Sequence, residues 1–309
     1  MVADDLTRAS QLHAAGLAAH SRGHPRQALR LLHRAEVLTA TARESHETKR
    51  LVAAISISVA ATVAETQGVA RGTEALNIAT AQARSLDDPA LLVKVHCQRA
   101  FMAARTGDFG VALDQLDAAE TLIEHAEPNE QFAILLNGGN LRMFRGELSV
   151  ARRQFTRAAD RARMHRMPDE VFKALHNLGY AEFLAGRLPN AIRAMDEAGA
   201  LEVDVSKGIW LLDRARVLAE AGMTLQADSS LAEAAAIFRR DRLAQDLGET
   251  ELERARCALV AGEIDTARRL AMRARDRFRR RGNDRWRRSA ELLLLQGDLA
   301  AGRPGARLT

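Results

Sequence analysis

The stretch HNLGYAEFLAGRLPNAI, residues 176–192, decides the fold of this chain. A run of small and large apolar residues ends at Gly186, and Pro189 stands near the start of a second run. Glycine just past one helix and proline in the first turn of the next are typical of two helices joined by a tight turn. Gly179, seven residues before the turn glycine, predicts a close approach of the two helices because it has no side chain to hold them apart.

The same pattern recurs along the whole chain. Together with Gly186, the other predicted turn glycines follow one another at intervals of 35 to 45 residues: Gly23, Gly68, Gly107, Gly146, Gly222, Gly262 and Gly297. A small residue stands seven positions before each: Gly16, Ala61, Ala100, Gly139, Gly179, Ala215, Ala255 and Ala290. A larger apolar residue stands nine positions after five of them: Leu32, Leu116, Phe155, Met195 and Leu231. This period predicts an all-α array of about seven helical hairpins and a final helix, forming a single domain over residues 1–309.

The composition agrees with such an array. Of the 309 residues 47% are hydrophobic but only 4% are aromatic, so the core must consist mainly of small aliphatic side chains. This hydrophobic content excludes a disordered chain. Two cysteines provide no disulfide framework and indicate a reducing compartment. Acidic Asp4 and Asp5 replace the basic start of a secretory signal, and no apolar run is long enough to span a bilayer. We therefore expect a cytoplasmic protein that does not associate with a membrane.

Residues 176–192 resemble the tetratricopeptide repeat, and the resemblance extends over nearly the whole chain. It implies a right-handed superhelix whose first helices line a concave groove that binds protein or extended peptide. Two features depart from the family pattern: the period is nearer 39 than about 34 residues, and alanine usually replaces the aromatic residue expected four positions after the small one.

A narrower resemblance lies at the start of the chain. Residues 12–23 (LHAAGLAAHSRG) and the following segment 25–35 are similar to helical arrays that precede CHAT (caspase-like) peptidase domains in high-GC bacteria. The chain ends soon after the last expected helix, which leaves no room for a peptidase domain. The resemblance therefore implies the recognition module of a CHAT-type peptidase system.

The family resemblance places the residues nine and six positions before each turn glycine in the groove. The set it implies consists of four amides, two aromatic walls and two arginines: Gln98, Asn137, Asn140, Asn177, Phe101, Tyr180, Arg216 and Arg256. The amides suit the backbone of an extended peptide because they both donate and accept hydrogen bonds. They suit equally well the bracing of neighbouring helices. The arginines favour either an acidic ligand side chain or pairing within the array with Asp213 or Glu253.

Two details of the groove limit these interpretations. The carboxylate clamp that binds C-terminal peptides needs Lys or Arg beside the asparagines, but Leu136, Ile209 and Asp213 occupy those positions, so we exclude it. Gly138, beside Gly139 within a predicted helix, indicates either tolerated close packing or a flexible point in the middle of the groove.

A cluster of arginines lies near the C-terminus. Between Arg268 and Arg288 there are eleven arginines and two aspartates. The predicted basic ridge on the outer face of the array consists of Arg268, Arg269, Arg273, Arg277, Arg280 and Arg281, with Arg275 and Arg279 beside them. Such a ridge suits a solvated face, protein docking or nucleic acid, for which charge alone gives salt-sensitive affinity. The alternative function is therefore a nucleic-acid-associated regulator. Consecutive leucines 292–295 also favour end-to-end self-association.

No catalytic or cofactor-binding motif is evident. The sequence has no phosphate-binding GxxxxGK loop and no CxxC or HExxH metal spacing. Cys97 and Cys257 are expected to be small core residues, and His20 and His24 have no third ligand near them in the sequence. We therefore expect a non-catalytic protein- or peptide-binding scaffold with no cofactor and no metal.

Overall fold

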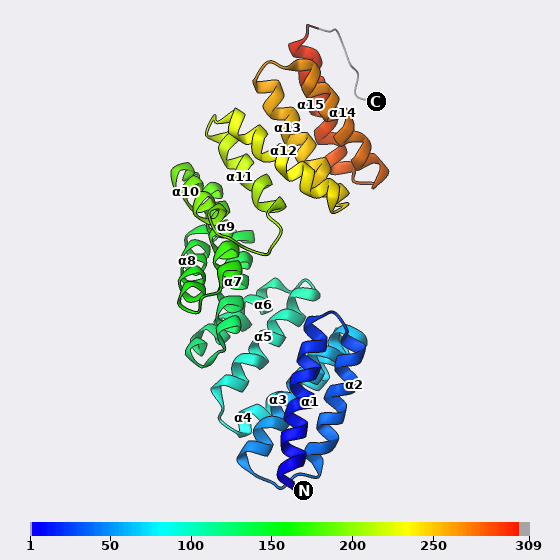
Figure 1. Ribbon diagram of the computed structural model, residues 1–309, viewed down its shortest axis with the longest axis vertical. Helices are drawn as coiled ribbons and strands as arrows, with labels where there is room; N and C mark the ends of the chain where they lie inside the picture. Colours follow the sequence, from blue (N-terminus) through cyan, green and yellow to red (C-terminus); the bar gives the residue numbers. More distant parts are fainter. Residues whose placement is uncertain (1, 303–309) are drawn as a thin grey trace. The chain divides into compact units, whose positions relative to one another are not determined.

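The computed structural model describes residues 2–302, with side chains from residue 5 onward. Over this range the chain consists of α-helices and one short 3-10 helix, without a strand (Figure 1). The helices are α1 (Val2–Ser21), α2 (Pro25–Ala40), α3 (His46–Thr66), α4 (Val69–Ser85), α5 (Pro89–Arg105), α6 (Phe109–Thr121), η1 (Ile123–His125), α7 (Pro128–Phe144), α8 (Leu148–Met164), α9 (Pro168–Leu184), α10 (Leu188–Gly199), α11 (Gly208–Glu220), α12 (Thr224–Arg240), α13 (Ala244–Val260), α14 (Ile264–Arg280) and α15 (Asp284–Ala300). They form seven antiparallel hairpins and a final helix, which confirms the predicted all-α array.

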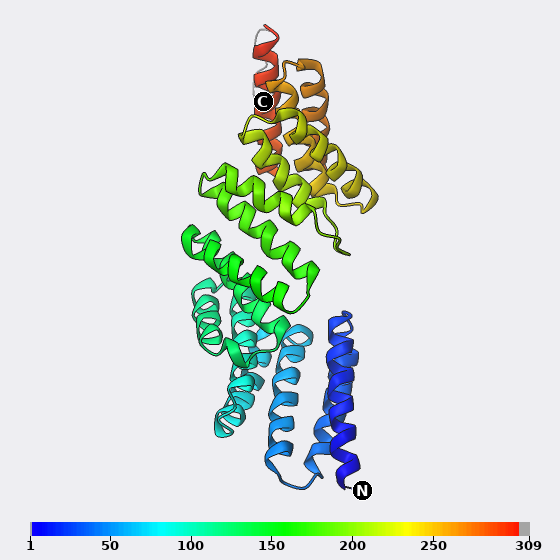
Figure 2. The same ribbon diagram turned by 60° about the vertical axis from the view of Figure 1, so that its left-hand side comes forward.

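The helices group into two compact units. Unit 1 comprises residues 1–165, with hairpins α1–α2 to α7–α8, and unit 2 comprises the chain from residue 166, with hairpins α9–α10 to α13–α14 and α15 (Figures 1 and 2). Within a unit each second helix packs on its own partner and on the first helix of the next hairpin, as α2 does on α3 and α12 on α13. This stacking buries a continuous core that no hairpin could form alone. The single domain over residues 1–309 stays a prediction.

The hairpin turns follow the glycine pattern. The glycine of each of the seven turns has a φ between 72° and 104°, where a residue with a side chain would be strained. Prolines begin α2, α5, α7 and α9, where their missing N–H group costs no hydrogen bond. The prediction of a turn at Gly297 is wrong, because this residue is buried inside α15. Its missing side chain leaves room for Arg268, whose Cγ would lie 3.3 Å from a Cβ at this position.

Small residues lie where the two helices of a hairpin touch, as predicted. A Cβ built on Gly139 would lie 2.5 Å from Cε1 of Phe155, and one on Gly179 would lie 2.9 Å from Cγ of Met195. Atoms do not approach that closely, so these hairpins require glycine at the contact. Phe155 and Met195, predicted as the larger residues that fill the gaps, are both fully buried.

Gly138 is also held in close packing. The amide of Gln154 lies 3.0 Å from the position of a Cβ on Gly138. Gln154 is buried, donates a hydrogen bond to Glu120 at 2.8 Å and accepts one from Arg142 at 3.1 Å. This contact between α7 and α8 favours the packing interpretation of Gly138 over a flexible point.

The outer face of α15 leaves apolar side chains in contact with solvent. Leu293 is buried, whereas Leu292 and Leu299 are 57% and 75% exposed. Association through this face stays a prediction. Among the described residues, none of the helices combines the length and the apolar character needed to cross a membrane.

Candidate functional site

Unit 1 contains a small cavity between α5, α6 and α7. Its volume is about 250 Å³. It is lined by Cys97, Ala100, Phe101, Ala104, Ala112, Leu116, Ala133, Ile134, Asn137, Asn140 and Leu141. The floor is apolar, with Ile134 and Leu116 buried, while Phe101 is 43% exposed and Asn137 is open to solvent. The structure thus brings together three residues of the predicted groove, namely Phe101, Asn137 and Asn140, around one apolar hollow.

The two cysteines are poor nucleophiles. Burial is the main cause that raises the pKa of Cys97 to about 12, and nearby Glu130 adds to it, although Lys94 opposes the effect. Burial likewise raises the pKa of Cys257 to about 11. Both thiols are therefore protonated at neutral pH, whereas catalytic cysteines react as thiolates. In the part of the chain that the structure describes, no three His, Cys, Asp or Glu side chains are grouped so as to hold a metal ion.

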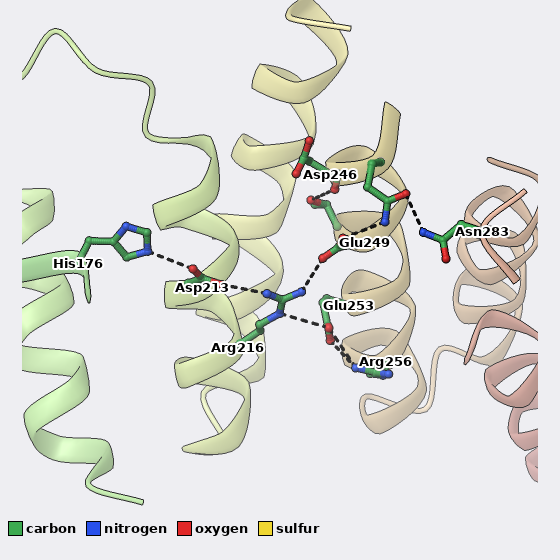
Figure 3. Close-up of polar contacts among 10 residues, drawn as sticks. His176, Asp213, Arg216, Asp246, Glu249, Glu253, Arg256 and Asn283 are labelled. Carbon is green, nitrogen blue, oxygen red and sulfur yellow. Dashed lines mark hydrogen bonds and ion pairs between the residues drawn. The ribbon is translucent and has the colours of Figure 1, made fainter. Parts of the chain in front are cut away.

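Unit 2 carries a network of charges across the first helices α9, α11 and α13 (Figure 3). The guanidinium of Arg216 donates to Asp213 at 2.9 Å, to Glu249 at 3.1 Å and to Glu253 at 3.4 Å. Asp213 also contacts the ring of His176 at 3.1 Å, and Glu253 accepts from Arg256 at 2.9 Å. Arg216 and Arg256 thus make the pairing within the array that the sequence offered as an alternative to ligand binding.

Helical spacing explains part of this network. Asp213 and Arg216 are three residues apart, as are Glu253 and Arg256, so each pair shares one face of its helix. Burial opposes the charge of Arg216, but Asp213, Glu253 and Glu249 outweigh it and raise the pKa of the guanidinium. Arg216 is therefore a fixed cation that ties α11 to α13.

A larger cavity of about 530 Å³ adjoins this network within unit 2. It is lined by Tyr180, Phe183, Ala215, Arg216, Ala219, Glu220, Thr224, Leu231, Glu249, Glu253, Arg256, Cys257, Val260 and Trp286. The rings of Tyr180 and Phe183 lie 5.9 Å apart and form one aromatic wall. The structure thus brings Tyr180, Arg216 and Arg256 together, while Gln98 and Asn177 line neither of these two cavities.

The sequence did not indicate several residues of this cavity. Glu249 stands four positions before Glu253 on one helical face, a spacing that could have signalled it. Nothing in the sequence indicated that Phe183, Glu220 and Trp286 line this cavity, because they come from three helices that only the fold brings together.

Some arginines of the predicted basic ridge form ion pairs with carboxylates of the same chain. Arg277 and Arg273 contact the two carboxylate oxygens of Glu251 at 2.7 and 3.0 Å, and Glu251 is only 2% exposed. Arg268 pairs with Asp298 of α15. The expectation that these arginines are exposed is therefore wrong for Arg268 and Arg277, because each is half-buried against a carboxylate that packing has removed from water. Arg273 is exposed as predicted, although it also pairs with Glu251.

The remaining arginines of the ridge are solvent-facing. Arg269 is exposed and donates to Thr266 at 3.0 Å, on its own helix. Arg280 and Arg281 are exposed and make no ion pair with any residue that the structure describes. The free basic surface is therefore smaller than the predicted ridge.

Comparison with known proteins is informative only at the level of structure. No family model matches the chain, and no curated protein matches its sequence. Among solved structures, the apo form of the quorum sensor NprR from B. thuringiensis is 12% identical, with a TM-score of 0.68, and the match covers 94% of this chain and 81% of that one. A Rap protein complexed with competence and sporulation factor is 15% identical, with a TM-score of 0.59, covering 98% and 87%.

A third structure contains the same fold as part of a longer protein. It is a signal transduction ATPase with numerous domains from Pyrococcus horikoshii, which has a tetratricopeptide repeat sensor. The identity is 13% and the TM-score 0.52, and the match covers 94% of this chain but only 39% of that protein. At such low identities the likeness concerns the fold alone. The chain is an all-α solenoid with the architecture of tetratricopeptide-like repeat proteins.

Proposed function

We propose that this chain is a non-catalytic scaffold of the bacterial cytoplasm that binds an extended peptide, or an extended segment of a protein partner. The observation that carries the proposal is the unit 1 cavity, where Phe101 and Asn137 lie at the rim of an apolar hollow. The repeat proteins of similar fold include one complexed with competence and sporulation factor, and this supports a ligand-binding role for the fold.

The size of the cavity and the amide at its rim suit a peptide better than a free small molecule. Its volume of about 250 Å³ is below the range of about 300–1,000 Å³ common for drug-sized ligands, so it has room for one or two side chains. The amide of Asn137 can both donate to and accept from a peptide backbone beside the cavity. An apolar side chain would enter against Phe101 and Ile134, and the backbone would run past the asparagines.

The test is selection of peptides from a random library displayed on phage, with the purified full chain as the target. Selected peptides are then synthesised with a fluorescent label, and their dissociation constants are measured by anisotropy. Phe101→Ala removes the rim of the cavity, and we expect it to weaken binding about tenfold or more, as truncation of a buried aromatic contact does. Phe144→Ala is the matched control, because Phe144 is 84% exposed and does not line the cavity. Equal binding by the two variants would contradict this site.

A narrower form of the proposal makes the chain the recognition module of a CHAT-type peptidase system. Its support is the sequence resemblance of residues 12–35. We expect a CHAT peptidase encoded near this chain to copurify with it when the two are coexpressed. Absence of a complex, with both proteins soluble, would remove this role and leave peptide binding untouched.

The nucleic-acid alternative depends on Arg269, Arg280 and Arg281, which are exposed and form no ion pair among the described residues. Their test is duplex DNA or RNA binding across a salt series, with Arg280→Gln/Arg281→Gln as the variant. Phosphate contacts would give an affinity that falls steeply with salt, and the variant would reduce the slope by about two. No binding at low ionic strength would dismiss the alternative.

A further inference from the structure

The unit 2 cavity carries more negative than positive charge. Its wall includes the carboxylates of Glu220, Glu249 and Glu253 and the guanidinium groups of Arg216 and Arg256. Asp213, bound to Arg216 at 2.9 Å, adds a fourth carboxylate. Four negative groups therefore face two positive ones.

Both arginines are already paired with carboxylates of the array. Arg216 uses Nε, Nη1 and Nη2 on three different carboxylates, and Arg256 holds both oxygens of Glu253. His176 contacts Asp213 and carries a charge only when protonated, and even then one negative charge remains in excess. An acidic ligand at Arg216 would have to displace these internal pairs, whereas a basic ligand would complete the charge balance.

The walls of the cavity also suit a cation. Tyr180 and Phe183 form an aromatic pair on α9, and Trp286 of α15 also lines the cavity. Aromatic faces attract guanidinium and ammonium groups, especially where water is partly excluded. Glu220 is exposed and has no ion pair among the described residues, so its carboxylate is available to a ligand.

We propose that the unit 2 cavity binds the guanidinium or ammonium group of an arginine or lysine side chain in a peptide ligand. This inference rests on the proposed function, and it adds the charge of one ligand residue and the place where that residue lies. Glu220, Glu249 and Glu253 provide the negative charge, and the aromatic wall packs against the aliphatic part of the side chain.

The experiment uses a phage-displayed library of random dodecapeptides and the full chain. We expect the selected peptides to be enriched in arginine or lysine at one position. A synthetic peptide from this set should bind Glu220→Gln roughly two to five times more weakly than the unchanged protein, the upper part of the range for losing one exposed charge contact. Glu233→Gln is the matched control, because Glu233 is an exposed glutamate of α12 outside the cavity, and it should bind as the unchanged protein does.

The outcomes separate this inference from the proposed function. If no peptide is selected, peptide binding itself fails, and the inference fails with it. If peptides are selected without basic enrichment, or if Glu220→Gln and Glu233→Gln bind alike, the cation site is overturned while peptide binding stands. Replacing the basic residue of the synthetic peptide by norleucine gives a second measure: an unchanged affinity would also overturn the inference.

Discussion

The ring of Phe155 on α8 occupies the space that a side chain on Gly139 of α7 would fill. An ideal Cβ on Gly139 would lie 2.5 Å from Cε1 of Phe155, far inside contact distance. Met195 has the same relation to Gly179, and Leu32 has it to Gly16, each pair being sixteen residues apart across the hairpin turn. A glycine facing a large residue is thus a shared device that sets how closely two helices of a hairpin approach.

Gly139→Ala is expected to destabilise unit 1. The added methyl group would force Phe155, which is fully buried, out of its position. Overpacking of this kind costs about 1–3 kcal/mol in the free energy of unfolding, more than the helix propensity gained by replacing glycine with alanine. Urea denaturation followed by circular dichroism measures the difference.

Gly138→Ala is the matched control for this prediction. Its Cβ would meet the end of the Gln154 side chain, which can shift more easily than a buried ring. We expect a change within about 1 kcal/mol of zero. The second check is Gly139→Ala/Phe155→Leu, whose smaller partner should recover part of the lost stability. An unchanged stability in Gly139→Ala would show that the hairpin relaxes freely at this contact.

Arg273→Gln/Arg277→Gln should destabilise unit 2. These side chains neutralise Glu251, which is 2% exposed, and their removal leaves a buried carboxylate without a cation. We expect a loss of about 2–3 kcal/mol, allowing for solvent at the more exposed Arg273. Thermal unfolding measures it. Arg280→Gln/Arg281→Gln removes the same charge from exposed positions and should change the stability by less than about 0.5 kcal/mol. Equal effects of the two variants would contradict a structural role for the pair.

Arg216→Gln should weaken the contact between α11 and α13. It leaves Asp213, Glu249 and Glu253 close together without their shared cation, and Arg216 itself is only 20% exposed. The expected loss is about 2–3 kcal/mol. The measurement is amide hydrogen exchange in α11 and α13. Exchange there should be faster in Arg216→Gln than in the control Arg239→Gln, which changes an exposed arginine. Exchange that rises equally in both variants would show that the network does not join these helices.

Cys97 is expected to be unreactive in the native protein. Burial is the largest cause that raises its pKa from 9.0 to about 12, so the thiolate fraction at neutral pH is about 10³ times lower than in a free thiol. Iodoacetamide labelling of the Cys257→Ser variant, followed by mass spectrometry, should be orders of magnitude slower in buffer than in guanidinium chloride. Similar rates in the two solvents would mean that the cavity around Cys97 opens readily.

Because neutral His13 is partly buried, unit 1 should become less stable as the pH falls. Burial chiefly, with the charge of Lys94, lowers its pKa from 6.5, and the ring is hydrogen-bonded to Ser58 at 2.9 Å. The unfolded chain therefore takes up the proton more readily, so the stability that neutral His13 contributes is present above about pH 6.5 and is lost as the pH falls. His13→Gln should flatten the pH dependence of the free energy of unfolding below about pH 6.5.

Sequence alone was enough to predict the helices and their pairing. Glycine can adopt a positive φ, proline fits the first turn of a helix, and small residues allow close contact, so Gly186, Pro189 and Gly179 define a hairpin through local geometry. The same reasoning gave a wrong prediction at Gly297. Glycine occurs both at close helix contacts and in turns, and the sequence alone does not distinguish the two. Only the packing of Arg268 distinguishes them.

Tertiary structure decided which side chains meet. Glu249 and Arg216 are 33 residues apart, and Glu251 meets Arg277 across 26, so no short-range spacing signals either contact. The sequence therefore indicated that Arg216 would be paired or free, but not that three carboxylates surround it. Local conformational preference determines where a helix begins and ends, whereas burial and charge depend on neighbours that are assembled only when the hairpins stack. That is why the repeats could be predicted from the sequence, whereas the candidate cavities of units 1 and 2 and their charge balance could be found only from the fold.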